Sequence, residues 1–188
     1  MEIRDKDGKI LVLKTDDDRS PLEREKVFSK GVDLEALDLK RADMRNANLE
    51  YAQLDSADLS EADLQGATLG MANMGSVNFF RANLRDTDLY GSFLNMANFD
   101  EANLEGSNLQ GANLIQASLR GANLTNANLS PDNMGVETSL HGADLSGAKV
   151  QGANFDQAMY DGLTVFPKGF DPKEHNMKFD AADTRQFE

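Results

Sequence analysis

A five-residue pattern fills residues 32–165 and constrains the fold of this chain more than any other feature. Each unit is a small residue, Asp or Asn, Leu, and two variable residues, as in Ala62-Asp63-Leu64. Counted by central residue, there are 21 repeats from Leu34 to Met134 and six more from Leu140 to Val165, after a one-residue shift within residues 130–139. The chain needs a structure that places every fifth residue in the same direction.

Neither regular secondary structure satisfies this spacing. On an α-helix, a period of five rotates each Leu by about 140°, so the Leu side chains would form no buried stripe. In a flat strand, side chains alternate, and an odd period sends successive Leu residues to opposite faces. We therefore expect a coil that turns a corner once per repeat. Leu and the small residue point inward, Asp or Asn points outward, and the variable pair makes the corner.

These repeats resemble those of the pentapeptide-repeat proteins. The resemblance covers about seven-tenths of the chain and implies an all-β fold, a right-handed quadrilateral β-helix with four repeats in each coil. On that basis residues 32–165 would form about seven coils.

Two features of the sequence support a coil of four repeats, which places equivalent residues 20 positions apart. Charges alternate along one expected corner at residues 41, 61, 81 and 101, and we expect these side chains to form a structural charge ladder: Arg41, Glu61, Arg81 and Glu101. Stacked strands lie about 4.8 Å apart, close enough for such cross-strand pairs to attract. Arg85 with Glu105 and Asp100 with Arg120 have the same spacing. Phe79 and Phe99 would share one interior column.

Segments on both sides of the repeats are expected to close the coil. Residues 1–31 predict a β-hairpin with a two-residue turn at Asp7-Gly8 and a capping helix that begins at Ser20 and ends near Gly31. Residues 166–188 predict a C-terminal cap, in which Phe166 and Phe170 seal the last coil and the tail forms one helical turn or docks back. Residues 130–138 predict a loop at one corner, either a plain bulge or a contact for a partner.

Composition narrows the possible locations and partners. The chain contains no Cys and no long apolar run, so we expect a cytoplasmic protein without disulfides or a membrane anchor. The net charge is −13, and residues 32–165 account for −12 of it, with 19 acidic and 7 basic residues. This charge argues against direct binding of nucleic acid or of an anionic membrane.

No constellation for catalysis can be assembled from the sequence. The two histidines, His141 and His175, lack a matching nucleophile, phosphate loop or metal-ligand cluster. The outward carboxylates repeat with the fold, so none can be singled out as catalytic. We predict a protein without enzymatic activity, cofactor or metal.

Two kinds of binding remain. Some members of the family resemble duplex DNA and act on the type II topoisomerase gyrase, and the acidity of this solenoid allows that function. However, its acidic residues occur in bands and not in a continuous stripe.

The favoured alternative is a protein-binding or scaffold function through an apolar patch on the outer surface. Phe93 occupies the position of the outward Asp or Asn, and four apolar residues fall at corners beside it. The candidate patch is Met71, Tyr90, Phe93, Met96 and Ile115. The partner is an unidentified protein, and a homodimer face is one form that this surface could take.

Overall fold

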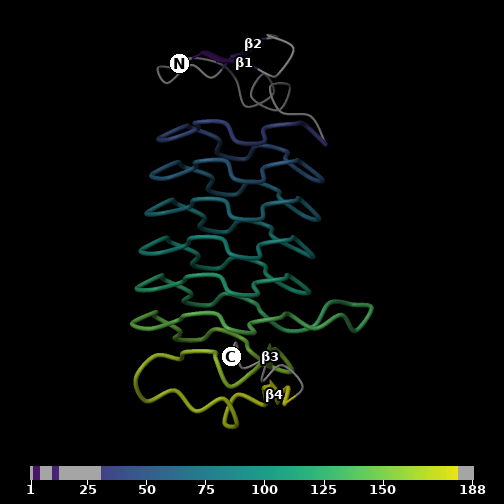
Figure 1. Cartoon of the computed structure of the whole chain (residues 1–188), viewed down its shortest axis with the longest axis vertical. Coiled ribbons are helices and arrows are strands. Elements are labelled where there is room, and N and C mark those ends of the chain that lie inside the picture. Colours follow the sequence, from purple (N-terminus) through teal and green to yellow (C-terminus); the bar gives the residue numbers. More distant parts are fainter. Residues whose placement is uncertain (1, 5–9, 13–30, 182–188) are drawn as a thin grey trace, which may run out of the picture.

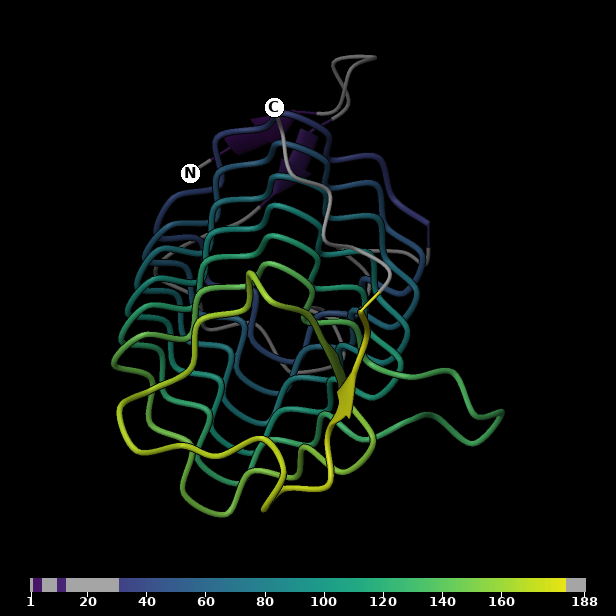
Figure 2. The ribbon, with the colours of Figure 1, turned by 60° about the horizontal axis from the view of Figure 1, so that its bottom comes forward.

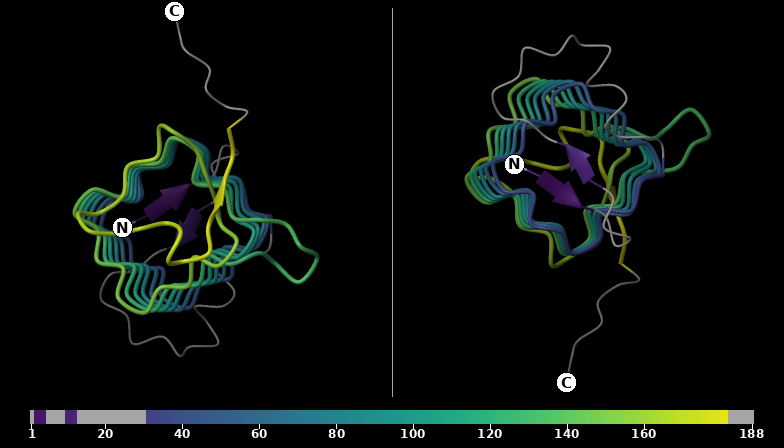
Figure 3. Two further views of the ribbon diagram at one scale, coloured as in Figure 1. Left: turned by 90° about the horizontal axis from the view of Figure 1, so that it is seen from below. Right: turned by 90° about the horizontal axis from the view of Figure 1, so that it is seen from above.

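The computed structural model describes residues 2–4, 10–12 and 31–181. Within them, residues 31–165 form a stack of square coils (Figures 1 and 3). Bridging residues of neighbouring coils lie 20 positions apart and run parallel, as in Asp43↔Asp63 and Asn83↔Asn103. The predicted coil length is therefore observed. The strands long enough to be named lie only at the two ends of the described chain.

Each repeat is held to the coils before and after it. The backbone N–H of Leu64 donates to the carbonyl of Asn83 in the next coil at 2.8 Å, and the N–H of Asp63 donates to Ala42 in the preceding coil at 2.9 Å. Leu64 and Ala62 are buried, as predicted. Phe79 and Phe99 stack inside the coil, with ring centroids 5.1 Å apart.

The corners explain why Asp or Asn precedes Leu. At a typical corner the N–H of Ala62 donates to the carbonyl of Leu59 at 3.1 Å, and Glu61 has a φ of 60°. This geometry matches a type II turn, whose third residue needs a positive φ. The side chain of Asp58 accepts the N–H of Ser60 at 3.0 Å, which satisfies a donor that the turn leaves free.

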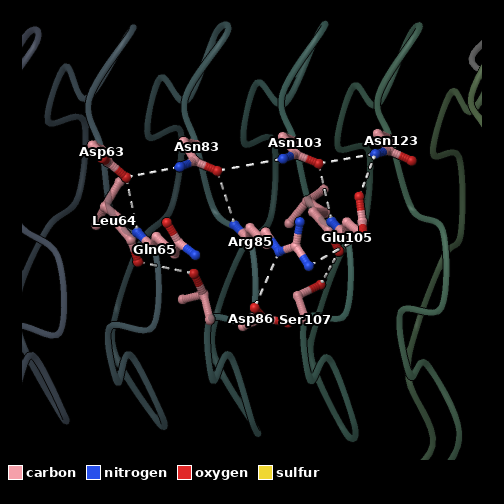
Figure 4. A network of polar contacts seen from close by, with 12 residues as sticks. Asp63, Leu64, Gln65, Asn83, Arg85, Asp86, Asn103, Glu105, Ser107 and Asn123 are labelled. Carbon is pink, nitrogen blue, oxygen red and sulfur yellow. Dashed lines mark hydrogen bonds and ion pairs between the residues drawn. The ribbon is translucent and has the colours of Figure 1, made fainter.

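The outward amides also bond to one another along the stack. Figure 4 shows one such row, in which Asn83 donates to Asp63 at 2.8 Å and Asn123 donates to Asn103 at 3.0 Å. Every donor in this row faces the N-terminal end, where an Asp accepts the first bond. The Asp or Asn position thus stabilises both its own corner and the contact between coils.

The break in the pattern is a six-residue insertion. Asn113 bridges Ser139, whereas the regular spacing would place Asn133 opposite it, and the intervening loop projects from one corner (Figures 1 and 3). Met134, predicted as an inward centre, is 75% exposed in this loop. That prediction was wrong because six inserted residues shift a five-residue register by only one position.

The repeat pattern also ends earlier than predicted. Asp144 bridges Val165, whereas the regular spacing would place Thr164 opposite it. Val165 therefore occupies an outward position and is 46% exposed, not an inward centre. The extra residue lies in a turn organised by Asp161. The carboxylate of Asp161 accepts backbone N–H groups of Gly142, Leu163 and Thr164 at 2.9–3.0 Å.

Beyond this turn the chain crosses the end of the stack (Figures 2 and 3). Phe166 and Phe170 stack with centroids 5.0 Å apart, and Phe170 also contacts the buried Phe155. The tail then docks back, because β4 (Lys178–Phe179) pairs in parallel with β3 (Met159–Tyr160).

At the N-terminus, β1 (Glu2–Arg4) and β2 (Ile10–Val12) form an antiparallel pair, as predicted for a hairpin. Arg4 pairs with Ile10, whereas a two-residue turn at Asp7-Gly8 would place Arg4 opposite Leu11. The observed strand register therefore differs by one residue from the expected one, and the turn itself lies outside the described residues. The predicted capping helix at residues 20–30 lies outside the described residues.

Candidate protein-interaction surface

The bridges divide the outer surface into four faces, each named here after one residue of its outward column. The Phe93 face contains Asp33, Gln53, Asn73, Phe93, Asn113, Ser139 and Met159. The Asn103 face, on the opposite side, contains Asp43, Asp63, Asn83, Asn103, Asn123 and Lys149. The Asp58 and Asp88 faces lie between these two. A face together with its two flanking corners is called a side.

The five residues of the candidate patch all lie on the Phe93 side. Phe93 is 49% exposed between Asn73 and Asn113. The other four stack in pairs at the two corners, because the N–H of Met71 donates to the carbonyl of Tyr90 and the N–H of Met96 donates to that of Ile115. Met96 is the most exposed of the five, and Tyr90 and Ile115 are half-buried. The fold therefore gathers these residues on three neighbouring coils.

Tyr90 also connects the patch to the inserted loop. Its hydroxyl donates to the carboxylate of Asp132 at 3.0 Å, across the corner residue Gly111 of the coil between them. This hydrogen bond raises the pKa of Tyr90 above its usual value. The loop is therefore anchored to the same corner that carries Met71.

The loop has a defined shape. The carboxylate of Asp132 accepts the N–H groups of Val136 and Met134, both at 2.8 Å, and the N–H of Asp132 donates to the carbonyl of Val136 at 2.9 Å. The first of these bonds is the main cause of a lowered pKa at Asp132. Two large apolar side chains, Met134 and Val136, are exposed as a result. Pro131 and Gly135 indicated the loop in the sequence, but Met134 was assigned to the interior.

The residues of the expected charge ladder pair two by two. Arg41 Nε lies 2.8 Å from Glu61, and Arg81 Nε lies 2.7 Å from Glu101. Arg85 similarly contacts Glu105 in the next coil, at 3.5 Å (Figure 4). These side chains are largely exposed, so solvent screening leaves each pair only weakly stabilising. The ion pairs connect neighbouring coils.

The sides differ sharply in charge. All seven basic residues of the solenoid lie on the Asn103 side: Lys40, Arg41, Arg45, Arg81, Arg85, Arg120 and Lys149. Seven acidic residues share that side: Asp43, Glu61, Asp63, Asp86, Asp100, Glu101 and Glu105. The remaining twelve acidic residues lie elsewhere, so the net charge of −12 falls on the rest of the outer surface. Sequence reasoning missed this segregation because the face of each residue was not assigned.

The histidines have local packing partners. His141 Nδ1 lies 2.7 Å from the Ser139 hydroxyl, and Nε2 lies 3.4 Å from Asp180 of the tail. The ring of His175 stacks on Phe170 at 4.2 Å. Within the described residues, no group of three or more His, Asp or Glu side chains is placed to hold a metal ion. The same residues include no helix long and apolar enough to cross a bilayer.

Comparisons with known proteins agree with the repeat architecture. The family described as "Pentapeptide repeats" matches in eight copies, over residues 30–66, 57–95, 97–130 and 136–159. No curated protein sequence gives a match.

Several solved structures are similar to this chain. The trypsin-treated plasmid-mediated fluoroquinolone resistance protein QnrB1 has 21% identity and a TM-score of 0.48, covering 80% of this chain and 91% of its own. HetL from Nostoc sp. strain PCC 7120, described as involved in heterocyst differentiation regulation, has 27% identity and a TM-score of 0.31, covering 80% and 68%. Rfr23 from Cyanothece 51142 has 30% identity and a TM-score of 0.26, covering 77% and 92%.

Proposed function

Because this chain belongs to the pentapeptide-repeat family, we propose that it is a non-enzymatic solenoid that binds another protein through its outer surface. The observation that carries this proposal is Phe93, a half-exposed aromatic residue in an outward column of polar residues. We further propose a cytoplasmic protein that requires no cofactor or metal and binds neither nucleic acid nor membranes directly.

The coil itself gives no reason for a Phe at position 93. In the outward columns, Asn residues bond to the neighbouring coil, as Asn98 does by donating to Asn78 at 3.1 Å. Phe93 lacks such a group and keeps about half of its surface in water. Together with Met71 and Met96 it forms an exposed apolar area of the kind that typically marks a protein contact.

The loop adds to this surface. Asp132 holds the loop backbone in one conformation while Met134 and Val136 remain exposed. A preordered loop loses little conformational entropy when it binds, which favours affinity. The patch and the loop, which are joined by the Tyr90–Asp132 hydrogen bond, together place exposed apolar side chains on the Phe93 side.

Affinity capture from a host lysate tests the proposal. Wild type is compared with the double variant Phe93→Asp/Ile115→Asp and with Lys149→Asp, which makes the same change in net charge on the opposite side. We expect a partner to be retained by wild type and Lys149→Asp and lost by the double variant, with the coil still folded. Equal capture by all three proteins would refute binding through this patch.

The same variants test the homodimer form of the proposal. If a second copy occupies the patch, the double variant lowers the sedimentation coefficient of the wild-type dimer to that of a monomer. An unchanged dimer excludes the Phe93 side as the dimer contact.

The second candidate is a DNA-mimicking modulator of gyrase. The acidity of the solenoid supports it, since residues 32–165 carry 19 acidic and 7 basic residues. The charge balance of the Asn103 side counts against it, because B-DNA is uniformly anionic around its axis. Inhibition of gyrase supercoiling at micromolar protein would support this candidate, and no effect at saturating concentration would exclude it.

A further inference from the structure

The eight acidic residues of the Phe93 side form two bands with the apolar patch between them. The N-terminal band is Asp33, Glu35, Glu50 and Asp55, and the C-terminal band is Asp132, Glu137, Asp156 and Asp161. No basic residue of residues 32–165 lies on this side, and Lys178 of β4, which pairs with Met159 at the C-terminal end, contacts Glu137. Along the axis of the stack, the Phe93 side therefore presents an acidic band, the apolar patch and a second acidic band.

The distance between the bands follows from the stacking. Along one corner, backbone bonds link successive coils from Ser56 through Ser76 and Met96 to Gln116, and Gly142 then contacts Asp161. Asp55 and Asp161 are thus five coils apart on this corner, and Glu50 lies four coils from the base of the loop. At about 4.8 Å per coil, the bands are separated by roughly 19–24 Å.

The acidic groups differ in how far they face solvent. Glu35 and Asp156 are exposed, one in each band, and the Asp156 carboxylate accepts a single side-chain hydrogen bond, from Asn176. Asp161, in contrast, is almost fully buried in its turn. Glu137 contacts Lys178 of β4 at 3.0 Å, and Asp132 is bonded within the loop. Glu35 and Asp156 are consequently the groups best placed to meet an approaching partner.

We propose that the Phe93 side binds a protein surface with an apolar centre flanked at both ends by Lys or Arg side chains, at the spacing of the two acidic bands. This inference rests on the proposed function and adds the chemistry of the partner. The apolar centre of the partner would cover Phe93 and Met96 and remove them from water. The Lys or Arg side chains at its two ends would complement the charge of the two acidic bands. A second copy of the chain fits poorly, because two Phe93 sides that face each other, in parallel or antiparallel orientation, place acidic bands of like charge against each other. The same repulsion excludes an anionic surface as the partner.

The probe for this inference is a fluorescent 20-residue amphipathic helical peptide with a Leu and Phe stripe and two Lys at each end. Glu35 and Asp156 lie nearly six coils apart, which is roughly 28 Å along the axis at about 4.8 Å per coil. The peptide length of about 30 Å spans this distance. A matched peptide carries Glu in place of the four Lys. Binding of both peptides to the full chain is measured by fluorescence anisotropy at low and at physiological ionic strength.

We expect wild type to bind the Lys peptide about tenfold more tightly than the Glu peptide, and less tightly at higher salt. The variant Glu35→Lys/Asp156→Lys should lose this preference. The control Glu61→Lys/Glu101→Lys makes the same charge change on the Asn103 side and should keep the preference. Equal binding of the two peptides, or an equal effect of the two variants, would overturn the inference.

Failure of this inference can be distinguished from failure of the proposed function. If Phe93→Asp/Ile115→Asp loses a captured partner that Glu35→Lys/Asp156→Lys still retains, the patch binds a protein but the charged bands do not select it. That result contradicts the present inference and leaves the proposed function intact.

Discussion

At the scale of single residues, the outward Asp or Asn of each repeat has two structural roles. It accepts the N–H of the residue two positions later, and it bonds to the equivalent residue of a neighbouring coil, as Asn78 does with Phe80 and Asp58. The amide rows are directional, and those that contain Asn78 and Asn83 have an Asp as the acceptor at the N-terminal end. A carboxylate inside such a row would lack the donor that bonds to the preceding coil.

The substitution Asn83→Asp tests this direction. It would place a carboxylate against Asp63, now 2.8 Å from the Asn83 amide, and we expect a loss of about 1–3 kcal/mol in the free energy of unfolding at pH 7. Repulsion raises the pKa of both carboxyls, so stability should recover as the pH falls below about 5. Denaturant titrations at pH 7 and pH 4 measure this. In the neutral control Asn83→Ser, the loss should be smaller and independent of pH.

Asp161 makes a second pH-dependent contribution to the stability of the folded protein. Burial raises its pKa, but hydrogen bonds from Gly142, Thr164 and Leu163 outweigh this effect and hold the pKa below its usual value. A lowered folded-state pKa stabilises the protein above the unfolded-state value, and this stability is lost as the pH falls through the folded-state pKa. The C-terminal turn should therefore weaken below about pH 4.

We expect Asp161→Asn to lower the free energy of unfolding by about 1–3 kcal/mol at pH 7, because the neutral amide accepts weaker hydrogen bonds. At pH 3 the wild-type carboxyl is protonated, so the difference between the two proteins should shrink. A difference of the same size at both pH values would show that the charge of Asp161 does not stabilise the turn.

At the scale of elements, regular coils and irregular segments were predictable to different degrees. The five-residue period specified the inward and outward positions, because each corner must return Leu to the interior. The length of the coil followed from the resemblance to the pentapeptide-repeat proteins, supported by the 20-residue spacing of opposite charges and of Phe79 and Phe99. The same period could not give the length of the insertion, since one and six extra residues produce the same register. Met134 was misplaced for this reason, and Val165 was misplaced because one extra residue lies in the Asp161 turn. Both are apolar residues at the expected spacing and are exposed.

Deleting residues 131–136 tests whether the loop is an addition to an otherwise complete coil. The deletion joins Ser130 to Glu137, and the same residue pair already forms a corner at Ser60-Glu61. We expect the free energy of unfolding to change by about 1 kcal/mol or less, since short surface loops contribute little to stability. Circular dichroism during thermal unfolding checks this. A loss above about 3 kcal/mol would show that the loop supports the core.

At the scale of the whole molecule, the two opposite sides of the solenoid differ in charge and in exposed apolar residues. The Asn103 side carries balanced charges in ion pairs that connect neighbouring coils, such as Arg41 with Glu61. The Phe93 side carries the apolar patch, two acidic bands and the base of the loop. Such a division lets one side maintain the stack while the other is free to acquire a binding surface.

Site-specific photo-crosslinking in host cells tests whether the Phe93 side contacts another protein. A photoreactive phenylalanine analogue replaces Phe93 in one protein and Lys149, on the opposite side, in a second. We predict a discrete crosslinked protein for position 93 that is absent for position 149. Crosslinking from both positions alike, or from position 149 alone, would contradict a binding surface on the Phe93 side.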